Sequence, residues 1–163
     1  MKKSKKRIKT AFILYLIALT DLVIFKFFGD AGSVAERIQN TISDRNEGNW
    51  NFNLIPLRTI QSEIDFYARH SQFGFPFLVL AVNIFIFLPM GLLISFLFRK
   101  PSFLKTIGIS LAIISGIELL QFVTCLGILD IDDIILNTAG CAAGYLIFAF
   151  KNRIQTSGAD QCE

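Results

Sequence analysis

Four apolar runs, separated by polar stretches, limit what this chain can fold into more than any other feature. They cover residues 10–28, 75–98, 104–125 and 133–150. Each approaches the ~20 residues that a helix rising ~1.5 Å per residue needs to cross ~30 Å of hydrocarbon. Hydrophobic residues make up 53% of the 163-residue chain, more than the interior of a soluble domain of this size can hold. The runs therefore predict an all-α fold, an integral membrane bundle of four transmembrane helices.

The runs differ in ways that affect helix geometry. Asp21 and Lys26 interrupt the first, and Pro89 inside the second predicts a bend or a local break of the helix. Gly140 and Gly144 in the fourth predict close packing against another helix. A cleaved signal peptide is an alternative for the first run, because it also starts basic and has a short apolar core. We favour a retained helix, since the apolar character resumes after Asp21 and no clear cleavage site of small residues follows.

The lysines and arginines predict the orientation, because short loops rich in these residues stay in the cytoplasm. With four crossings, the basic N-terminus 1–9, the link after the second run and the tail 151–163 all lie inside. The transmembrane domain is then 10–150, and the long connection 29–72 and the link 126–132 lie outside. We predict a multi-pass protein of the cell membrane with both termini cytoplasmic. Its partner is the lipid bilayer and not nucleic acid, since the basic residues follow topology: Lys2, Lys3, Lys5, Lys6, Arg7, Lys9, Arg99, Lys100, Lys105, Lys151 and Arg153.

The external connection contains a second helix signal. After Pro56, which suits a first helical position, apolar residues recur at helical spacing: Leu57, Ile60, Ile64 and Tyr67. We expect an external amphipathic helix on the outer membrane surface, with a packed helix of a small external domain as an equally good alternative. His70 is the single histidine and has no neighbouring cysteine or histidine, so a solvated loop residue is the better interpretation than a metal ligand.

Polar residues inside the apolar runs point to a function, because a charge near the bilayer centre costs at least ~2.5–3.5 kcal/mol. Glu118 is the clearest example, and Ser115 and Gln121 share its helix face. Asn83, Asp133 and Asn137 fall in the same outer half of the membrane. We therefore predict an outward-facing polar pocket made by Glu118, Gln121, Asp130, Asp132, Asp133, Asn137 and Asn83, with Arg58 of the external segment as a partner for Glu118.

Several of these residues also have purely structural interpretations. Asp130 can be the N-cap of the fourth helix, while Asp132 and Asp133 complement the positive end of its dipole. Asn83 and Asn137 can simply join helices by hydrogen bonds. Glu118 is harder to explain in this way, because an unpaired carboxylate in hydrocarbon must take up a proton or find a partner.

The chain resembles the VanZ-like membrane proteins, whose namesake is associated with resistance to the glycopeptide teicoplanin. The resemblance rests on the external segment NLIPL, which adds Asn53 to the candidate pocket, on NIFIFLPMGLLI and SGIELLQF, and on DIDDIILNTAGCAAG. It implies a membrane location and a role in glycopeptide or envelope stress, but no reaction. Many members carry a basic residue shortly before the aspartates, where this chain has Gly127-Ile128-Leu129, and some continue into a further hydrophobic segment that is absent here.

Three functions are consistent with these observations. The preferred one is a non-enzymatic envelope protein that lowers susceptibility to teicoplanin-type glycopeptides, with the antibiotic or a lipid-linked cell-wall precursor as partner. The second is a membrane-embedded enzyme acting on a lipid-linked substrate, with Glu118, Asp130 and Asp133 holding a divalent cation such as Mg²⁺. No motif for an activated nucleophile supports it. The third is a transporter or flippase component, which needs a homo-oligomer, for example through Gly140 and Gly144.

Overall fold

The computed structural model describes residues 2–22, 31–69, 75–98 and 101–159, and these are mostly helical, as predicted. The helices are α1 (Lys2–Thr20), α2 (Ala31–Asn46), α3 (Arg58–Arg69), α4 (Phe75–Leu97), α5 (Phe103–Thr124) and α6 (Ile131–Ala159). The strands β1 (Phe52–Asn53) and β2 (Leu129–Asp130) form a short parallel pair. Helix α6 continues into the segment predicted as a polar tail. His70 lies outside the described residues.

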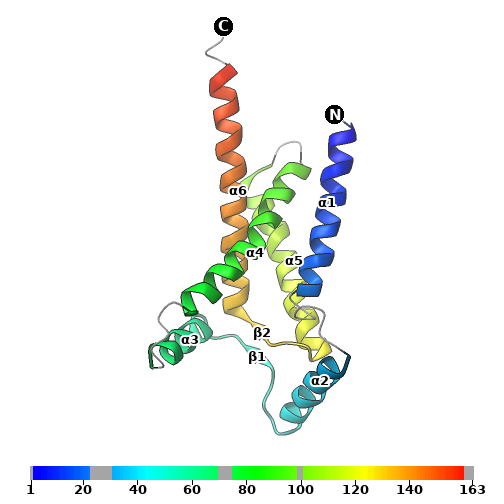
Figure 1. The fold of residues 1–163 in the computed structure, drawn as a ribbon, viewed down its shortest axis with the longest axis vertical. Helices are drawn as coiled ribbons and strands as arrows, with labels where there is room; N and C mark the ends of the chain where they lie inside the picture. Colours follow the sequence, from blue (N-terminus) through cyan, green and yellow to red (C-terminus); the bar gives the residue numbers. More distant parts are fainter. Residues whose placement is uncertain (1, 23–30, 70–74, 99–100, 160–163) are drawn as a thin grey trace.

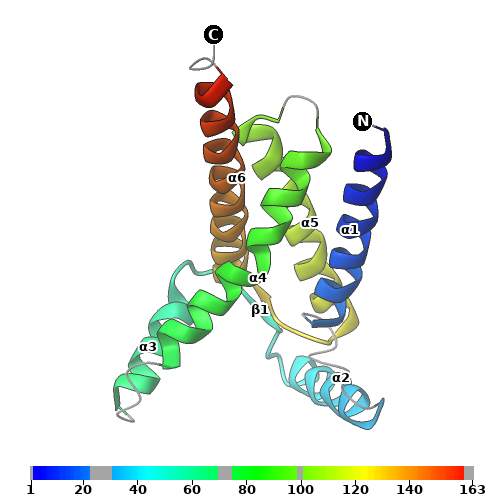
Figure 2. The same cartoon turned by 45° about the horizontal axis from the view of Figure 1, so that its top comes forward.

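Four helices, α1, α4, α5 and α6, stand side by side and alternate in direction (Figures 1 and 2). Both termini lie at one end of this bundle, whereas α2, α3 and the strand pair lie at the other. The bundle therefore has one end made by the two termini and the opposite end covered by the connection between α1 and α4.

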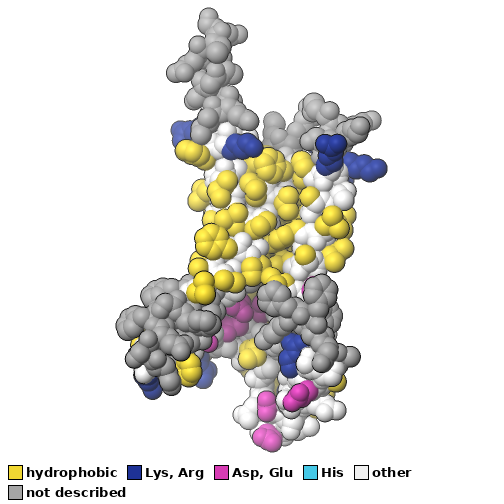
Figure 3. Space-filling view, viewed as in Figure 1, with side chains coloured by type: hydrophobic (Ala, Val, Ile, Leu, Met, Phe, Trp, Pro, Cys, Tyr) yellow, Lys and Arg dark blue, Asp and Glu magenta, His cyan; other side chains and the backbone are white. Residues whose placement is uncertain are grey.

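Three helices are long and apolar enough to cross a membrane: Leu80–Leu97 of α4, Phe103–Thr124 of α5 and Ile131–Arg153 of α6. They match the second, third and fourth predicted runs. Helix α1 does not qualify within the described residues, and residues 23–28 of the predicted first span lie outside them. The bundle carries a belt of apolar side chains on its outside (Figure 3). Three such helices with an apolar exterior are the arrangement of a multi-pass membrane protein.

The interior of the bundle contains polar side chains beside an apolar core that includes Met90 and Ile94. Ser95, Thr106 and Ser110 are fully buried, while Phe85 and Leu104 are 67% and 82% exposed. The Ser95 hydroxyl donates to the Gly91 carbonyl at 2.7 Å. Because lipid cannot hydrogen-bond, polar groups face other helices and apolar groups face outward.

Three glycines allow α4 and α6 to touch along their backbones. A Cβ atom at Gly91 would lie 1.9 Å from the Cys141 carbonyl oxygen, and one at Gly144 would lie 2.1 Å from that of Leu88. At Gly140 the distance to the Ile84 carbonyl oxygen would be 2.3 Å. The prediction of close packing at Gly140 and Gly144 is confirmed. The partner is α4 of the same chain, so these glycines are already covered and do not offer a face for a second copy.

Pro89 lies inside a continuous helix, so of the bend or local break predicted there, the break does not occur. Helix α4 is continuous from Phe75 to Leu97 although Pro89 removes one of its hydrogen bonds. One turn earlier, the Ile86 carbonyl accepts a hydrogen bond from the Tyr15 hydroxyl of α1 at 2.8 Å. This bond attaches α1 to the α4 segment that contains Pro89.

The external connection is more structured than its sequence suggested. A helix follows Pro56 as expected, but it begins at Arg58 and contacts α4 and α6. Its position on the membrane surface stays a prediction. Helix α2, which sequence analysis did not anticipate, occupies the first part of the same connection.

Candidate functional site

The site is built where the external connection meets the link between α5 and α6. The parallel pairing aligns Phe52 with Leu129 and Asn53 with Asp130. The Leu129 amide also donates to the Asn51 carbonyl at 3.0 Å. This pairing joins segments more than seventy residues apart. It places the side chains of the external segment directly beside the first turn of α6.

Asp130 is the N-cap of α6, as predicted. Its Oδ1 accepts from the Asp132 amide at 2.9 Å, which satisfies a donor that the helix start leaves free. The same carboxylate accepts from the Thr59 hydroxyl at 2.5 Å and from the Asn53 side-chain amide at 3.3 Å. Asp130 is only 7% exposed, so these bonds form away from most of the solvent. One residue therefore both starts α6 and binds the external segment.

Asp132 accepts hydrogen bonds from the backbone at the start of another helix, α3. Its Oδ1 accepts from the Leu57 amide at 2.5 Å, and its Oδ2 accepts from the Thr59 and Ile60 amides at 2.9 and 3.2 Å. These amides are at the start of α3, where backbone N–H groups have no partner within the helix and the helix dipole is positive. Leu57, whose amide donates one of these bonds, has a φ of 65°, in the left-handed region that is uncommon for residues other than glycine. Asp132 thus fastens α3 to the membrane bundle.

Glu118 lies in the last two turns of α5, where its side chain is only 2% exposed. Its Oε2 accepts from the Asp130 amide at 3.2 Å. Asp130 and Asp133 are its charged neighbours. We refer to Glu118, Asp130, Asp132 and Asp133 as the acidic cluster. In Figure 3, acidic side chains are visible at the base of the apolar belt.

The two predicted asparagines also face the interior. The Asn83 side-chain amide of α4 donates to Asp133 of α6 at 3.4 Å, which agrees with a role in joining helices. Asn137 is 4% exposed, and its Oδ1 and the Thr138 hydroxyl are buried polar atoms that have no hydrogen-bond partner among the residues that the structure describes. Gln121 is buried and packs against Gly127, where a Cβ atom would lie 2.9 Å from its Nε2.

Two expected neighbours of Glu118 lie elsewhere. Arg58 is exposed at the start of α3, and the bond found for Glu118 is to the Asp130 backbone. Ser115 is exposed on α5, because three residues turn a helix by less than one full turn and this difference carries Ser115 out of the buried stripe. Within the described residues, no group of three or more His, Cys, Asp or Glu side chains is arranged to hold a metal ion. Glu118, Asp130 and Asp133 are thus neighbours without forming a ligand set.

Arg45 at the end of α2 is a residue of this region that sequence analysis missed. Its Nε donates to Asn51 Oδ1 at 2.7 Å, and its Nη2 donates to the Phe122 carbonyl at the end of α5. The guanidinium also lies 4.7 Å from the Phe122 ring centroid and 5.6 Å from that of Trp50. Asn51 in turn donates to the Gly127 carbonyl at 2.6 Å. The only local signal was an arginine close to Trp50 and several asparagines.

The acidic cluster is bordered by apolar side chains that point outward. We call these the apolar rim: Trp50, Phe52, Leu54, Ile55 and Ile128, each between 49% and 59% exposed. They come from β1, from its flanking residues and from the link before β2. The site therefore combines buried carboxylates, which position the external segment, with exposed apolar groups that are available for contact.

Comparison with known proteins identifies the family. A family model described as VanZ/LLP1 matches residues 12–152, and the chain belongs to this family. Over 71 residues the chain is 34% identical to Protein VanZ of Enterococcus faecium. That match covers 44% of this chain and 44% of the curated relative, so it spans less than half of the relative's length. No solved structure matches.

Proposed function

From its membership of the VanZ/LLP1 family, we propose that this chain is a non-enzymatic protein of the cell membrane that lowers susceptibility to teicoplanin-type glycopeptides. The resemblance to VanZ-like proteins suggests this class of compound. In this proposal the acidic cluster and the apolar rim face the outside of the cell, where a glycopeptide meets lipid-linked cell-wall precursors. The protein binds the antibiotic or its target there and does not modify either one.

The proposed topology has four crossings with both termini in the cytoplasm. Helix α1 supplies the first crossing, and its contacts with α4 support this assignment. The two termini share one end of the bundle, and lysine and arginine side chains gather at that end (Figures 1 and 3). Since basic segments remain inside, the end that carries the acidic cluster is the outer one.

The proposal rests on the hydrogen bonds that join the external segment to the start of α6. Two aspartates at the start of one membrane helix hold the external segment by at least five hydrogen bonds. Such a network is far more than a connecting loop needs, because two helices can be joined by a few residues. The network fixes Asn53 and the start of α3, next to the exposed side chains of Phe52, Leu54 and Ile55. Teicoplanin carries a fatty acyl chain, and the exposed side chains of the apolar rim suit contact with such a chain.

The test is a susceptibility panel in a sensitive Gram-positive host that expresses the full chain. We expect a greater rise in the inhibitory concentration of teicoplanin than in that of vancomycin, which lacks the acyl chain. Glu118→Gln should abolish the rise at matched membrane levels. Asp65→Asn, which changes an exposed acid on α3, is the matched control and should retain it. Equal protection against both antibiotics, or full protection by Glu118→Gln, contradicts the proposal.

A metal-dependent enzyme is the alternative that this panel also addresses. Glu118 and Asp130 are buried and bound to neighbouring groups of the chain, and this arrangement favours a positioning role. If protection depends on added divalent cation and disappears in both Glu118→Gln and Asp133→Asn, the enzyme becomes the better explanation.

A further inference from the structure

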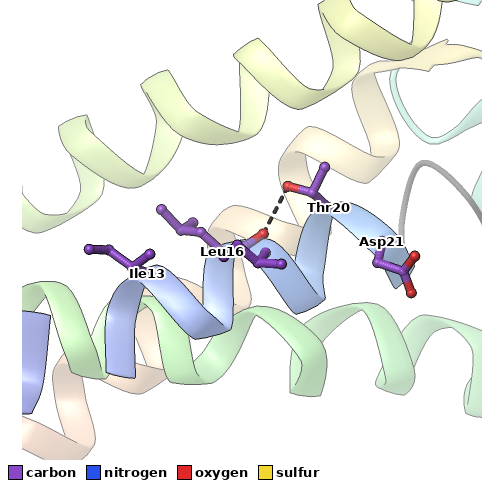
Figure 4. A pocket seen from close by; sticks show the side chains of 5 residues that line it. Ile13, Leu16, Thr20 and Asp21 are labelled. Carbon is purple, nitrogen blue, oxygen red and sulfur yellow. Dashed lines mark hydrogen bonds between the residues drawn. The ribbon is translucent and has the colours of Figure 1, made fainter. Parts of the chain in front are cut away.

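A groove on α1 is separate from the acidic cluster. It has a volume of about 450 Å³, within the usual range for sites that bind small molecules. The described residues that line it are Ile13, Leu16, Ile17, Thr20 and Asp21 (Figure 4). The labelled side chains of Leu16 and Thr20 point toward α5.

The groove follows from how α1 is attached to the bundle. Tyr15 and Leu19, four residues apart, lie on one face of α1 and contact its neighbours: Tyr15 donates to Ile86 of α4, and Leu19 is 2% exposed in the core. The lining residues recur at helical spacing on the adjoining face. There Ile13 and Ile17 are 57% and 63% exposed. One face of α1 is therefore fixed to α4, while the next face remains open along about two turns.

The two ends of the groove differ in chemistry. Ile13, Leu16 and Ile17 make one end apolar. Thr20 and Asp21 form the other end, away from the basic N-terminus. The Thr20 hydroxyl donates its hydrogen to the Leu16 carbonyl at 2.8 Å, so its remaining capacity is to accept (Figure 4). The Asp21 carboxylate also only accepts. This end of the groove therefore suits a cation with several N–H donors.

We propose that the groove binds one acyl chain of a membrane phospholipid with a primary amine headgroup, such as phosphatidylethanolamine. The chain lies along Ile13, Leu16 and Ile17, and the ammonium group donates to Thr20 and Asp21. With α1 crossing the membrane, this opening faces the bilayer, where a phospholipid acyl chain is the apolar ligand that surrounds it. The site rests on α1 crossing the membrane and does not depend on glycopeptide binding.

The experiment uses the full chain in nanodiscs of phosphatidylcholine that contain a trace of a lipid with a photoreactive acyl chain. One preparation carries phosphatidylethanolamine as the probe and the other carries phosphatidylcholine. Cross-links are mapped by mass spectrometry. We expect the amine probe to label residues 13–17 about fivefold more than the phosphatidylcholine probe, as for one exposed ion pair. Leu146 and Ile147 of α6, which are 61% and 49% exposed, are the internal control and should show no such preference.

Two variants separate the parts of the proposal. Asp21→Asn should remove the preference for the amine probe while acyl-chain labelling continues. Ile17→Trp should fill the groove and reduce labelling at Ile13 with either probe, and its size-exclusion profile reports whether it folds. Equal labelling of α1 and α6, or an unchanged preference in Asp21→Asn, overturns the proposal. Failure of both lipid probes to label Ile13 would also overturn it, because the groove would then be closed to lipid.

Discussion

Replacing Asp132 with alanine should release α3 from the bundle while the membrane helices stay folded. The carboxylate accepts from the Leu57, Thr59 and Ile60 amides at 2.5, 2.9 and 3.2 Å and is 1% exposed. A hydrogen bond to a charged group contributes about 1.5–3 kcal/mol net, and the three share one carboxylate, so they do not add fully. We therefore expect a local destabilisation of about 3–5 kcal/mol.

Hydrogen–deuterium exchange of the purified protein measures this loss directly. Since ~1.4 kcal/mol corresponds to a factor of ten, the amides of Thr59 and Ile60 should exchange on the order of a hundredfold faster or more. Asp132→Asn keeps one acceptor oxygen and should give a smaller increase. The control is Asp133→Asn, the adjacent acid, whose carboxylate accepts from the Asn83 side chain of α4.

Two results would contradict this role of Asp132. If Asp132→Ala changes the exchange of these amides by less than about threefold, the carboxylate is not what holds the start of α3. If Asp133→Asn accelerates them as much as Asp132→Ala, the effect comes from loss of charge in general. Either outcome would also weaken the proposal that the acidic cluster positions the outer site.

Two further predictions concern the packing of the helices. Gly91→Ala should lower the thermal unfolding temperature or prevent folding, since its Cβ would lie 1.9 Å from the Cys141 carbonyl oxygen. Gly108→Ala is the control, because the space around Gly108 is open. It should leave the stability of the protein unchanged or raise it by up to ~1 kcal/mol through helix propensity. Arg45→Gln should detach α2 from the end of α5, with a loss of about 1.5–3 kcal/mol of local stability. The fluorescence emission of Trp50, the single tryptophan, should change because Arg45 no longer lies over its ring. An unchanged spectrum and unchanged protease resistance would argue against the role of Arg45.

The site could be predicted only in part, because some of its contacts are local and others are not. Asp130 as N-cap and Asp132 in the first turn follow from their position before an apolar run, since capping involves neighbouring residues. Nothing in the local pattern indicated that Asp132 binds the start of α3 or that Arg45 reaches the end of α5. Those contacts join residues more than seventy positions apart, so they depend on how the elements pack.

By itself, the sequence determined the membrane helices α4, α5 and α6 and the side chains that must avoid lipid. Hydrophobicity acts over a short window, so 75–98, 104–125 and 133–150 coincide with helices to within a few residues, apart from the longer end of α6. The tertiary structure decided which polar groups meet. It paired β1 with β2 and left Arg58 exposed. It also buried Glu118 where its carboxylate accepts a hydrogen bond from the Asp130 amide. The physical reason is that burial in lipid requires a partner for each polar group, whereas only the packing of the chain selects that partner.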